Sequence, residues 1–249
     1  MRRRYKILII VLLVTLVVFA GFIVWAETPP SPMQQAINAL QSDSNVTVIS
    51  GQWSTFKPTN ANYTIGLIIY PGGRVDYRSY APLAHAIADE GYLTVIVPMP
   101  LNLAVFGANA ANEVIASHPE ITSWAIGGHS LGGTMAAQFA YQNPSKIEGL
   151  VLWAAYPASG NNMSSYKLQV TTIHGSNDGL VSTAQIQNSL EMLPPTAMYV
   201  EIAGGNHAQF GYYGDQSGDN QATITREAQQ SQTLNATVEL LQKLKLQGQ

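Results

Sequence analysis

The stretch GGHSLGG, from Gly127 to Gly133, surrounds a single serine with glycines. Glycine weakens both helices and strands, so a cluster of this kind needs a local reason. One reason is a turn too tight for side chains beside Ser130. The other is chance, since the 249-residue chain holds 21 glycines. The sequence on either side of the cluster decides between them.

That flanking sequence alternates between apolar runs and segments with helical spacing. The apolar runs, typical of strands, are 46–50, 63–70, 92–98, 123–128, 147–156, 168–175 and 197–204. Helical spacing occurs at 80–90, 103–118, 131–142, 182–193 and 223–246. Near-continuous apolar strands are typical of a parallel sheet covered on both faces. The alternation predicts an α/β fold with a doubly wound, mostly parallel sheet.

The glycine cluster falls between a strand ending near Gly128 and a helix beginning near Leu131. A strand, a sharp turn and a helix are the setting of a nucleophile elbow, where a serine sits in a strained backbone conformation. Gly128 and Gly132 would leave room where a Cβ would collide. The turn would raise the Ser130 hydroxyl above the carboxyl edge of the sheet, where open α/β sheets bind ligands. A phosphate loop is the alternative, but the lysine of that pattern is missing.

A serine hydroxyl is a weak nucleophile, so it needs a base, and the base needs an orienting carboxylate. His207 lies on a loop after the last predicted strand and fits the base best. Asp178 follows the 168–175 strand by three residues and is the candidate acid, although Asn-Asp-Gly also suits a plain turn. The order is then Ser130, Asp178, His207. Structural roles are expected for the other four histidines, His85, His118, His129 and His174.

From about Val46 onward the chain resembles the α/β-hydrolase superfamily, and within it the compact bacterial group described as fold-5 or dienelactone-hydrolase-like. The matching segments, in order, are YPGGRVDYRSYAPLAHAIADEGY, VPMPLNLAVF, GGHSLGG, IHGSNDGLV and GGNHAQFGYYGDQSGD. The resemblance implies Ser130 as nucleophile, Asp178 as acid and His207 as base, on a sheet of at most eight strands. The chain has no cysteine, so a cysteine-based mechanism such as that of dienelactone hydrolase does not carry over.

Two backbone N–H groups are expected to form an oxyanion hole. One is that of Leu131, directly after the serine. The other comes from the turn after the 63–70 strand, where Gly73 is slightly preferred and Arg74 is the alternative.

The substrate side of the site is less defined by the sequence. The apolar segment MPLNLAVF would wall an acyl pocket through Met99, Leu101 and Phe106, or would simply begin a buried helix. Many lipases insert a lid after the strand that corresponds to 147–156. Here only residues 157–167 lie between that predicted strand and the next one, 168–175. A fold without a large lid is therefore expected.

The N-terminus carries the clearest signal about location. Residues 1–6 are basic, and 7–26 form an apolar run without a charge, about 30 Å long as a helix. We expect a cytoplasmic stub at 1–6, a transmembrane signal anchor at 7–26, a spacer and lead-in at 27–45, and a hydrolase domain at 46–249 outside the membrane. Val24-Trp25-Ala26 leaves a cleaved signal peptide, and so a secreted protein, as the alternative.

The composition excludes several classes of protein. Without cysteine there are no disulfides, no thiolate metal sites and no lipidated cysteine. Beyond residue 6, eight basic residues face 15 acidic ones, a net charge of −7, which does not suit a nucleic-acid surface.

The sequence thus predicts a membrane-anchored serine hydrolase that cleaves a small-molecule ester and needs no metal or cofactor. A peptidase or amidase with the same three residues, and a silent binding module on this scaffold, are the alternatives.

Overall fold

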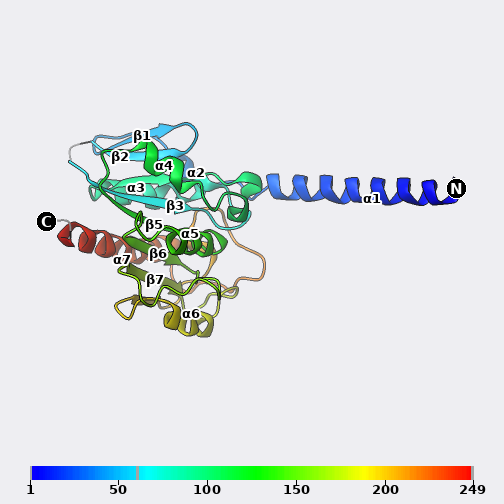
Figure 1. Cartoon of the computed structure of the whole chain (residues 1–249). Helices are drawn as coiled ribbons and strands as arrows, with labels where there is room; N and C mark the ends of the chain where they lie inside the picture. The colour runs from blue at the N-terminus through cyan, green and yellow to red at the C-terminus, as the bar shows by residue number, and fades with distance from the viewer. Residues whose placement is uncertain (1, 60–61, 248–249) are drawn as a thin grey trace.

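The computed structural model describes residues 2–59 and 62–247. Its centre is an eight-stranded sheet with the order β1-β2-β4-β3-β5-β6-β7-β8 (Figure 1). The pairs β1–β2 and β2–β4 are antiparallel and all others are parallel. The predicted α/β class with a mostly parallel sheet is confirmed. The strands are β1 Val46–Ser50, β2 Ser54–Pro58, β3 Ile65–Tyr70, β4 Leu93–Ile96, β5 Ser123–His129, β6 Gly149–Trp153, β7 Gln169–Gly175 and β8 Met198–Ile202.

Helices connect most of the parallel strands. The α-helices are α1 Arg2–Glu27, α2 Gln34–Asn38, α3 Ala81–Asp89, α4 Ala111–Ser117, α5 Leu131–Gln142, α6 Thr183–Ser189 and α7 Arg226–Gln247. Short 3₁₀ helices are η1 Tyr77–Tyr80, η2 Pro100–Asn102, η3 Ala104–Phe106, η4 Leu190–Met192 and η5 Ala208–Phe210. The helix predicted at 103–118 is correct only in its second half, because Leu103 is extended and the chain turns again at Gly107 before α4.

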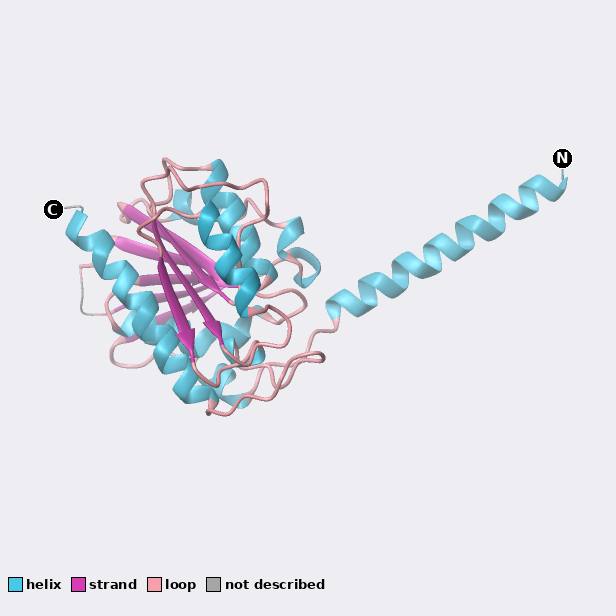
Figure 2. Ribbon diagram, turned by 90° about the horizontal axis from the view of Figure 1, so that it is seen from below, coloured by secondary structure: helices cyan, strands magenta, loops and turns pink. Residues whose placement is uncertain are grey.

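The strands alternate their side chains between two apolar layers. On β3, Leu67 and Ile69 join the layer formed with α3 and α7, whereas Ile68 and Tyr70 join the layer formed with α4 and α5. Figure 2 shows the strands enclosed between these helices. A sheet buried on both faces explains why its central strands read as continuous apolar runs.

The strand β2 and the connection between β6 and β7 differ in how well the sequence predicts them. β2 was not predicted, because STFKP has no apolar run and pairs only as an antiparallel strand near the edge. The connection between β6 and β7, residues 154–168, holds no helix or strand, as expected for a fold without a large lid.

α1 projects from the body of the molecule (Figures 1 and 2). Residues Tyr5–Glu27 are long and apolar enough to cross a membrane, by length and composition. A signal sequence near the N-terminus meets the same criterion. The helix is exposed from Tyr5 to Gly21, but Ala26 is fully buried against the sheet-containing body.

Candidate active site

Ser130 occupies the turn between β5 and α5. Its φ of 52° and ψ of −123° are unusual for a residue with a side chain, as predicted for an elbow. The Ser130 N–H donates to the Trp153 carbonyl at 2.9 Å, and its own carbonyl accepts from Thr134 in the first turn of α5 at 3.1 Å. The backbone on both sides of the serine therefore holds this conformation in place.

The glycines around Ser130 allow the elbow to lie against the end of β3. A Cβ on Gly128 would overlap the Tyr70 carbonyl oxygen, and one on Gly132 would overlap the carbonyl oxygens of Tyr70 and Pro71. Both positions are thus restricted to glycine by backbone atoms, which cannot move aside as side chains do. The cluster has a structural role, and chance composition does not explain it.

The structure brings the predicted acid and base together. His207 Nδ1 lies 2.8 Å from Asp178 Oδ2, and the two side chains are 1% and 0% exposed. The other carboxylate oxygen accepts the N–H groups of Leu180 at 2.8 Å and Val181 at 2.7 Å. Since Asp178 is an acceptor in all three contacts, His207 donates from Nδ1, and in the neutral ring the acceptor is then Nε2.

The His207 ring lies beside the elbow. His207 Nε2 is buried and has no hydrogen-bond partner in the described part of the chain. The His207 ring is centred 4.4 Å from the ring of His129, the neighbour of Ser130. No hydrogen bond joins Ser130 Oγ to His207 Nε2 among residues 2–59 and 62–247. Such bonds often tighten only when substrate binds.

The geometry discriminates between the two alternatives for the oxyanion hole. The Arg74 N–H donates to the Asn102 carbonyl at 2.7 Å and is therefore occupied. The N–H groups of Gly73 and Leu131 have no partner among the described residues. A Cβ on Gly73 would lie 3.1 Å from Leu131 Cδ2, so these two residues are adjacent in space. Gly73 is the better candidate.

Residues 66–231 match the model of the alpha/beta hydrolase family. The chain belongs to this family. No curated protein matches it. Solved structures with a similar fold include Est1E from Butyrivibrio proteoclasticus (14% identity, TM-score 0.58, 79% of this chain and 99% of that chain). A second is dienelactone hydrolase from Anabaena variabilis (15% identity, TM-score 0.62, 79% and 99%). A structure of Est1E with ferulic acid bound is also similar (13% identity, TM-score 0.58, 80% and 97%). At these identities the likeness concerns the fold.

A buried hydrogen-bond chain joins the two halves of the candidate site. The Tyr80 hydroxyl accepts the Gly72 N–H at 3.0 Å and lies 2.8 Å from His129 Nδ1. Burial, with the nearby His207, holds the pKa of His129 well below its usual value, so the ring is neutral. The Tyr80 hydroxyl and the Nδ1 of this neutral ring thus share a buried hydrogen bond. The turn that carries Gly73 is thereby attached to the elbow.

Asp219 connects the loop of the acid to the loop of the base. Its Oδ1 accepts the Gly179 N–H at 3.0 Å, and its Oδ2 accepts the Ala208 N–H at 2.8 Å. Gly179 follows Asp178, and Ala208 follows His207. Asp219 is not among the site residues predicted from the sequence; in the structure it bridges these two loops.

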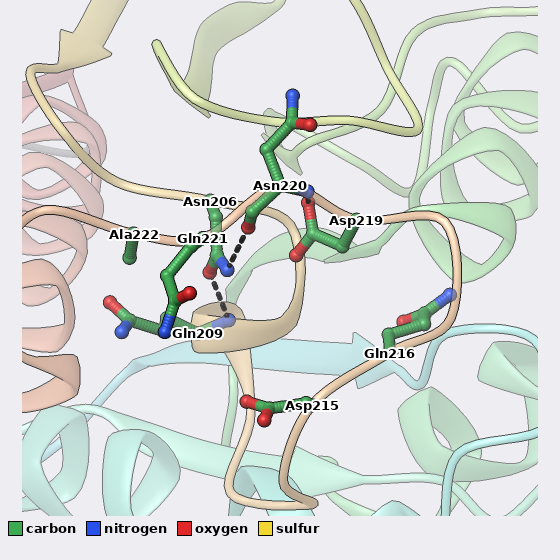
Figure 3. A pocket seen from close by; sticks show the side chains of 8 residues that line it. All are labelled: Asn206, Gln209, Asp215, Gln216, Asp219, Asn220, Gln221 and Ala222. Carbon is green, nitrogen blue, oxygen red and sulfur yellow. Dashed lines mark hydrogen bonds between the residues drawn. The ribbon is translucent and has the colours of Figure 1, made fainter.

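The loop that carries His207 is held by amide groups around a polar pocket of about 230 Å³ (Figure 3). The Asn206 side chain donates to the Asn220 carbonyl at 2.8 Å and accepts the Gln209 N–H at 3.1 Å. Gln229 of α7, fully buried, binds both the N–H and the carbonyl of Asn206, at 2.9 and 2.8 Å. Both backbone groups of the residue before His207 are thus fixed.

The remaining histidines lie outside the acid–base pair. His85 is 3.5 Å from Asp43, and His118 Nδ1 is 3.1 Å from a Glu120 oxygen. His174 is buried, with Nε2 3.0 Å from the Tyr199 hydroxyl, and desolvation lowers its pKa. No cluster of three or more His, Asp or Glu in the described ranges is arranged to hold a metal ion.

Met99, Leu101 and Phe106, the three predicted pocket residues, do not line the groove beside Gly73. Met99 is buried, Leu101 is half-buried with a φ of 55°, and Phe106 is 55% exposed. From this segment it is Leu103 that lines a groove of about 510 Å³ beside Gly73. Leu103 was missed because an apolar residue in an apolar segment carries no signal of its own.

Proposed function

We propose that the chain is a serine hydrolase that cleaves carboxylic esters through an acyl-enzyme on Ser130, and that α1 anchors it in a membrane. One observation carries the catalytic part. A buried histidine, bound to a carboxylate through Nδ1 and with no partner at Nε2, lies against His129, the residue directly before a serine in a strained elbow. A buried polar atom without a partner is costly, so this arrangement favours a functional role over a structural one.

In the proposed reaction, His207 Nε2 takes the proton of Ser130 as Oγ bonds to the carbonyl carbon. The carbonyl oxygen becomes negatively charged and accepts hydrogen bonds from the N–H groups of Gly73 and Leu131. The carbon–oxygen bond to the alcohol then breaks, and His207 gives its proton to the departing alcohol. Water adds to the carbonyl carbon of the acyl-enzyme as His207 takes its proton. The bond from that carbon to Ser130 Oγ then breaks, His207 returns the proton to Oγ, and the carboxylic acid leaves.

Esters are favoured over amides by the names of the similar structures, which are Est1E with ferulic acid bound, a carboxylic acid, and a dienelactone hydrolase, whose name gives a lactone as substrate. A peptidase or amidase would use the same residues. A matched ester and anilide of one acyl group separate these activities. A larger kcat/KM on the anilide would overturn the ester assignment.

The test of the nucleophile is covalent labelling with a fluorophosphonate. We expect the unaltered protein to be labelled and Ser130→Ala to be unlabelled, with turnover lower by about 10⁴-fold or more. His174→Gln is the matched control, since His174 is buried nearby but does not contact the acid–base pair through a hydrogen bond. Labelling lost in His174→Gln but kept in His207→Gln would show that the base is assigned wrongly. An unlabelled parent protein would favour a silent binding module.

The anchor rests on the exposed apolar helix Tyr5–Glu27 behind a basic N-terminus. The basic end would remain cytoplasmic and the hydrolase domain would lie outside. We expect the full chain to sediment with membranes and to resist extraction with alkaline carbonate. A mature N-terminus at Glu27 would instead demonstrate a cleaved signal peptide and a secreted enzyme.

A further inference from the structure

The end of α1 is attached to the loops that follow β3 and β4. The Arg74 guanidinium donates to the Trp25 carbonyl at 2.6 Å and to the Thr28 carbonyl at 2.9 Å. The Asn102 side chain donates to the Ala26 carbonyl at 3.0 Å. Carbonyls at a helix C-terminus lack partners within the helix, so the hydrolase domain itself supplies the cap. The Arg74 guanidinium also lies 4.7 Å from the centre of the Trp25 ring.

These two loops belong to the edge of the sheet that carries the candidate site. Arg74 follows Gly73 directly. Ser130 and His207 come after β5 and β8, and the carboxyl ends of parallel strands meet at one edge. From Gly21 back to Tyr5 the helix is exposed and leads away from the body (Figures 1 and 2). A bilayer spanned by α1 would therefore face the catalytic edge.

The same edge exposes apolar side chains. Beyond α1, the large apolar side chains that are exposed in the described residues are Ile49, Val105, Phe106, Leu180 and Leu246. Val105 and Phe106 follow Asn102 closely, and Leu180 lies in the loop after β7. Trp25, at the end of α1, is 48% exposed. Val105, Phe106, Leu180 and Trp25 would thus contact the bilayer that α1 spans. We therefore take a bilayer surface as the partner of this edge.

A groove leads from the end of α1 to the candidate oxyanion hole. Its volume is about 510 Å³, within the range of sites for small organic ligands. Trp25 and Pro30 line it together with Gly73, Leu103 and Tyr213. The segment that would leave the membrane is therefore itself a wall of the site.

We propose that the substrate is an amphiphilic carboxylic ester that resides in the bilayer and reaches Ser130 through this groove. The proposal rests on the proposed function, namely the anchored serine hydrolase. The acyl chain would remain near the apolar edge while the ester carbonyl approaches Gly73 and Leu131. Since no large lid covers the site in the part of the chain that the structure describes, the membrane surface itself would exclude bulk water from it.

The first experiment uses the full chain in phosphatidylcholine vesicles and two fluorogenic esters of 4-methylumbelliferone, the water-soluble acetate and the membrane-partitioning oleate. We expect the oleate to be cleaved with kcat/KM at least tenfold higher, compared at equal total ester. Cleavage of the acetate alone would overturn the membrane substrate and leave the serine hydrolase standing. If neither ester is cleaved and no fluorophosphonate label appears, the proposed function fails, and the inference built on it fails too.

The second experiment does not depend on activity. Because the chain has no cysteine, Val105→Cys and Leu246→Cys each introduce a single site for a nitrobenzoxadiazole label. Both positions are exposed, but Leu246 lies near the C-terminal end of α7, on the far side of the body from α1 (Figure 1). Spin-labelled lipids in the vesicles should quench the label at position 105 at least threefold more than that at 246. Equal quenching would show that the catalytic edge does not face the bilayer.

Discussion

The Tyr80 hydroxyl lies 2.8 Å from His129 Nδ1, and through it the Gly72–Gly73 turn is tied to the residue beside Ser130. Neither end of this chain touches the acid–base pair through a hydrogen bond. It instead fixes where the two candidate oxyanion donors lie relative to each other. Tyr80 is thus a positioning residue, and its effect should appear in the rate of acyl transfer.

Tyr80→Phe removes the hydroxyl and leaves the Gly72 N–H and His129 Nδ1 buried without a partner. We expect the free energy of unfolding to fall by about 1–3 kcal/mol. We also expect kcat to fall about tenfold with little change in KM, because the loss concerns the transition state. Denaturant unfolding and steady-state kinetics measure both. Tyr92→Phe is the control, since the Tyr92 side chain forms no hydrogen bond to another described residue; equal losses in the two variants would refute the role.

Ser130→Gly and Ser130→Ala both remove the nucleophile but differ in backbone strain. At a φ of 52° and ψ of −123° a Cβ is unfavourable, whereas glycine has none. The glycine variant should be more stable than the alanine variant by about 1 kcal/mol, although glycine normally destabilises. Thermal unfolding of the two inactive proteins, side by side, gives the answer. A more stable alanine variant would mean that the elbow is not strained.

Asp178→Asn should lower kcat by about 10⁴-fold, because an amide facing His207 Nδ1 leaves the ring in the wrong tautomer. Asp219→Asn should cost about tenfold, since it only loosens the link between Gly179 and Ala208. The shape of the pH–rate profile should survive in Asp219→Asn. Glu239→Gln, on the surface of α7, controls for the loss of one carboxylate and should leave the rate unchanged. A larger loss in Asp219→Asn than in Asp178→Asn would reverse the two roles.

Stability should fall as the pH falls below about 6.5, the ordinary value for histidine. Burial lowers the pKa of both His129 and His174 in the folded protein. Below that pH the unfolded chain binds protons that the folded chain does not, so the free energy of unfolding decreases. Melting temperatures from about pH 7 to about pH 5 measure the slope. His129→Gln and His174→Gln should each flatten it; unchanged slopes would contradict the cause.

The sequence predicted the parts of the site that depend on local pattern. Apolar runs located β3 to β8, and in a parallel sheet the ends of such runs meet at one edge, which brings Ser130, Asp178 and His207 to the same region. The contacts that hold these loops could not be predicted in the same way. Tyr80 and His129 are 49 residues apart, and Gly179 and Asp219 are 40 apart. A tyrosine before a helix and an aspartate in a polar loop are ordinary residues until the fold gives them partners.

The sequence did not predict the attachment of α1 to the domain either. A spacer and lead-in are expected at 27–45, and that expectation does not place the end of the helix against the domain. In the structure Arg74 and Asn102 reach the helix end itself, and Ala26 is buried. Arg74 and Asn102 both have a positive φ, which the surrounding sequence does not indicate for either residue.

Because of this attachment, the domain cannot rotate freely about α1. Turning the domain about α1 would break the hydrogen bonds to Trp25, Ala26 and Thr28 at once. An enzyme held this way in a bilayer would search by sliding in two dimensions. Its rate would follow the number of substrate molecules per unit area of its own membrane, and diluting the surrounding solution would leave that rate unchanged.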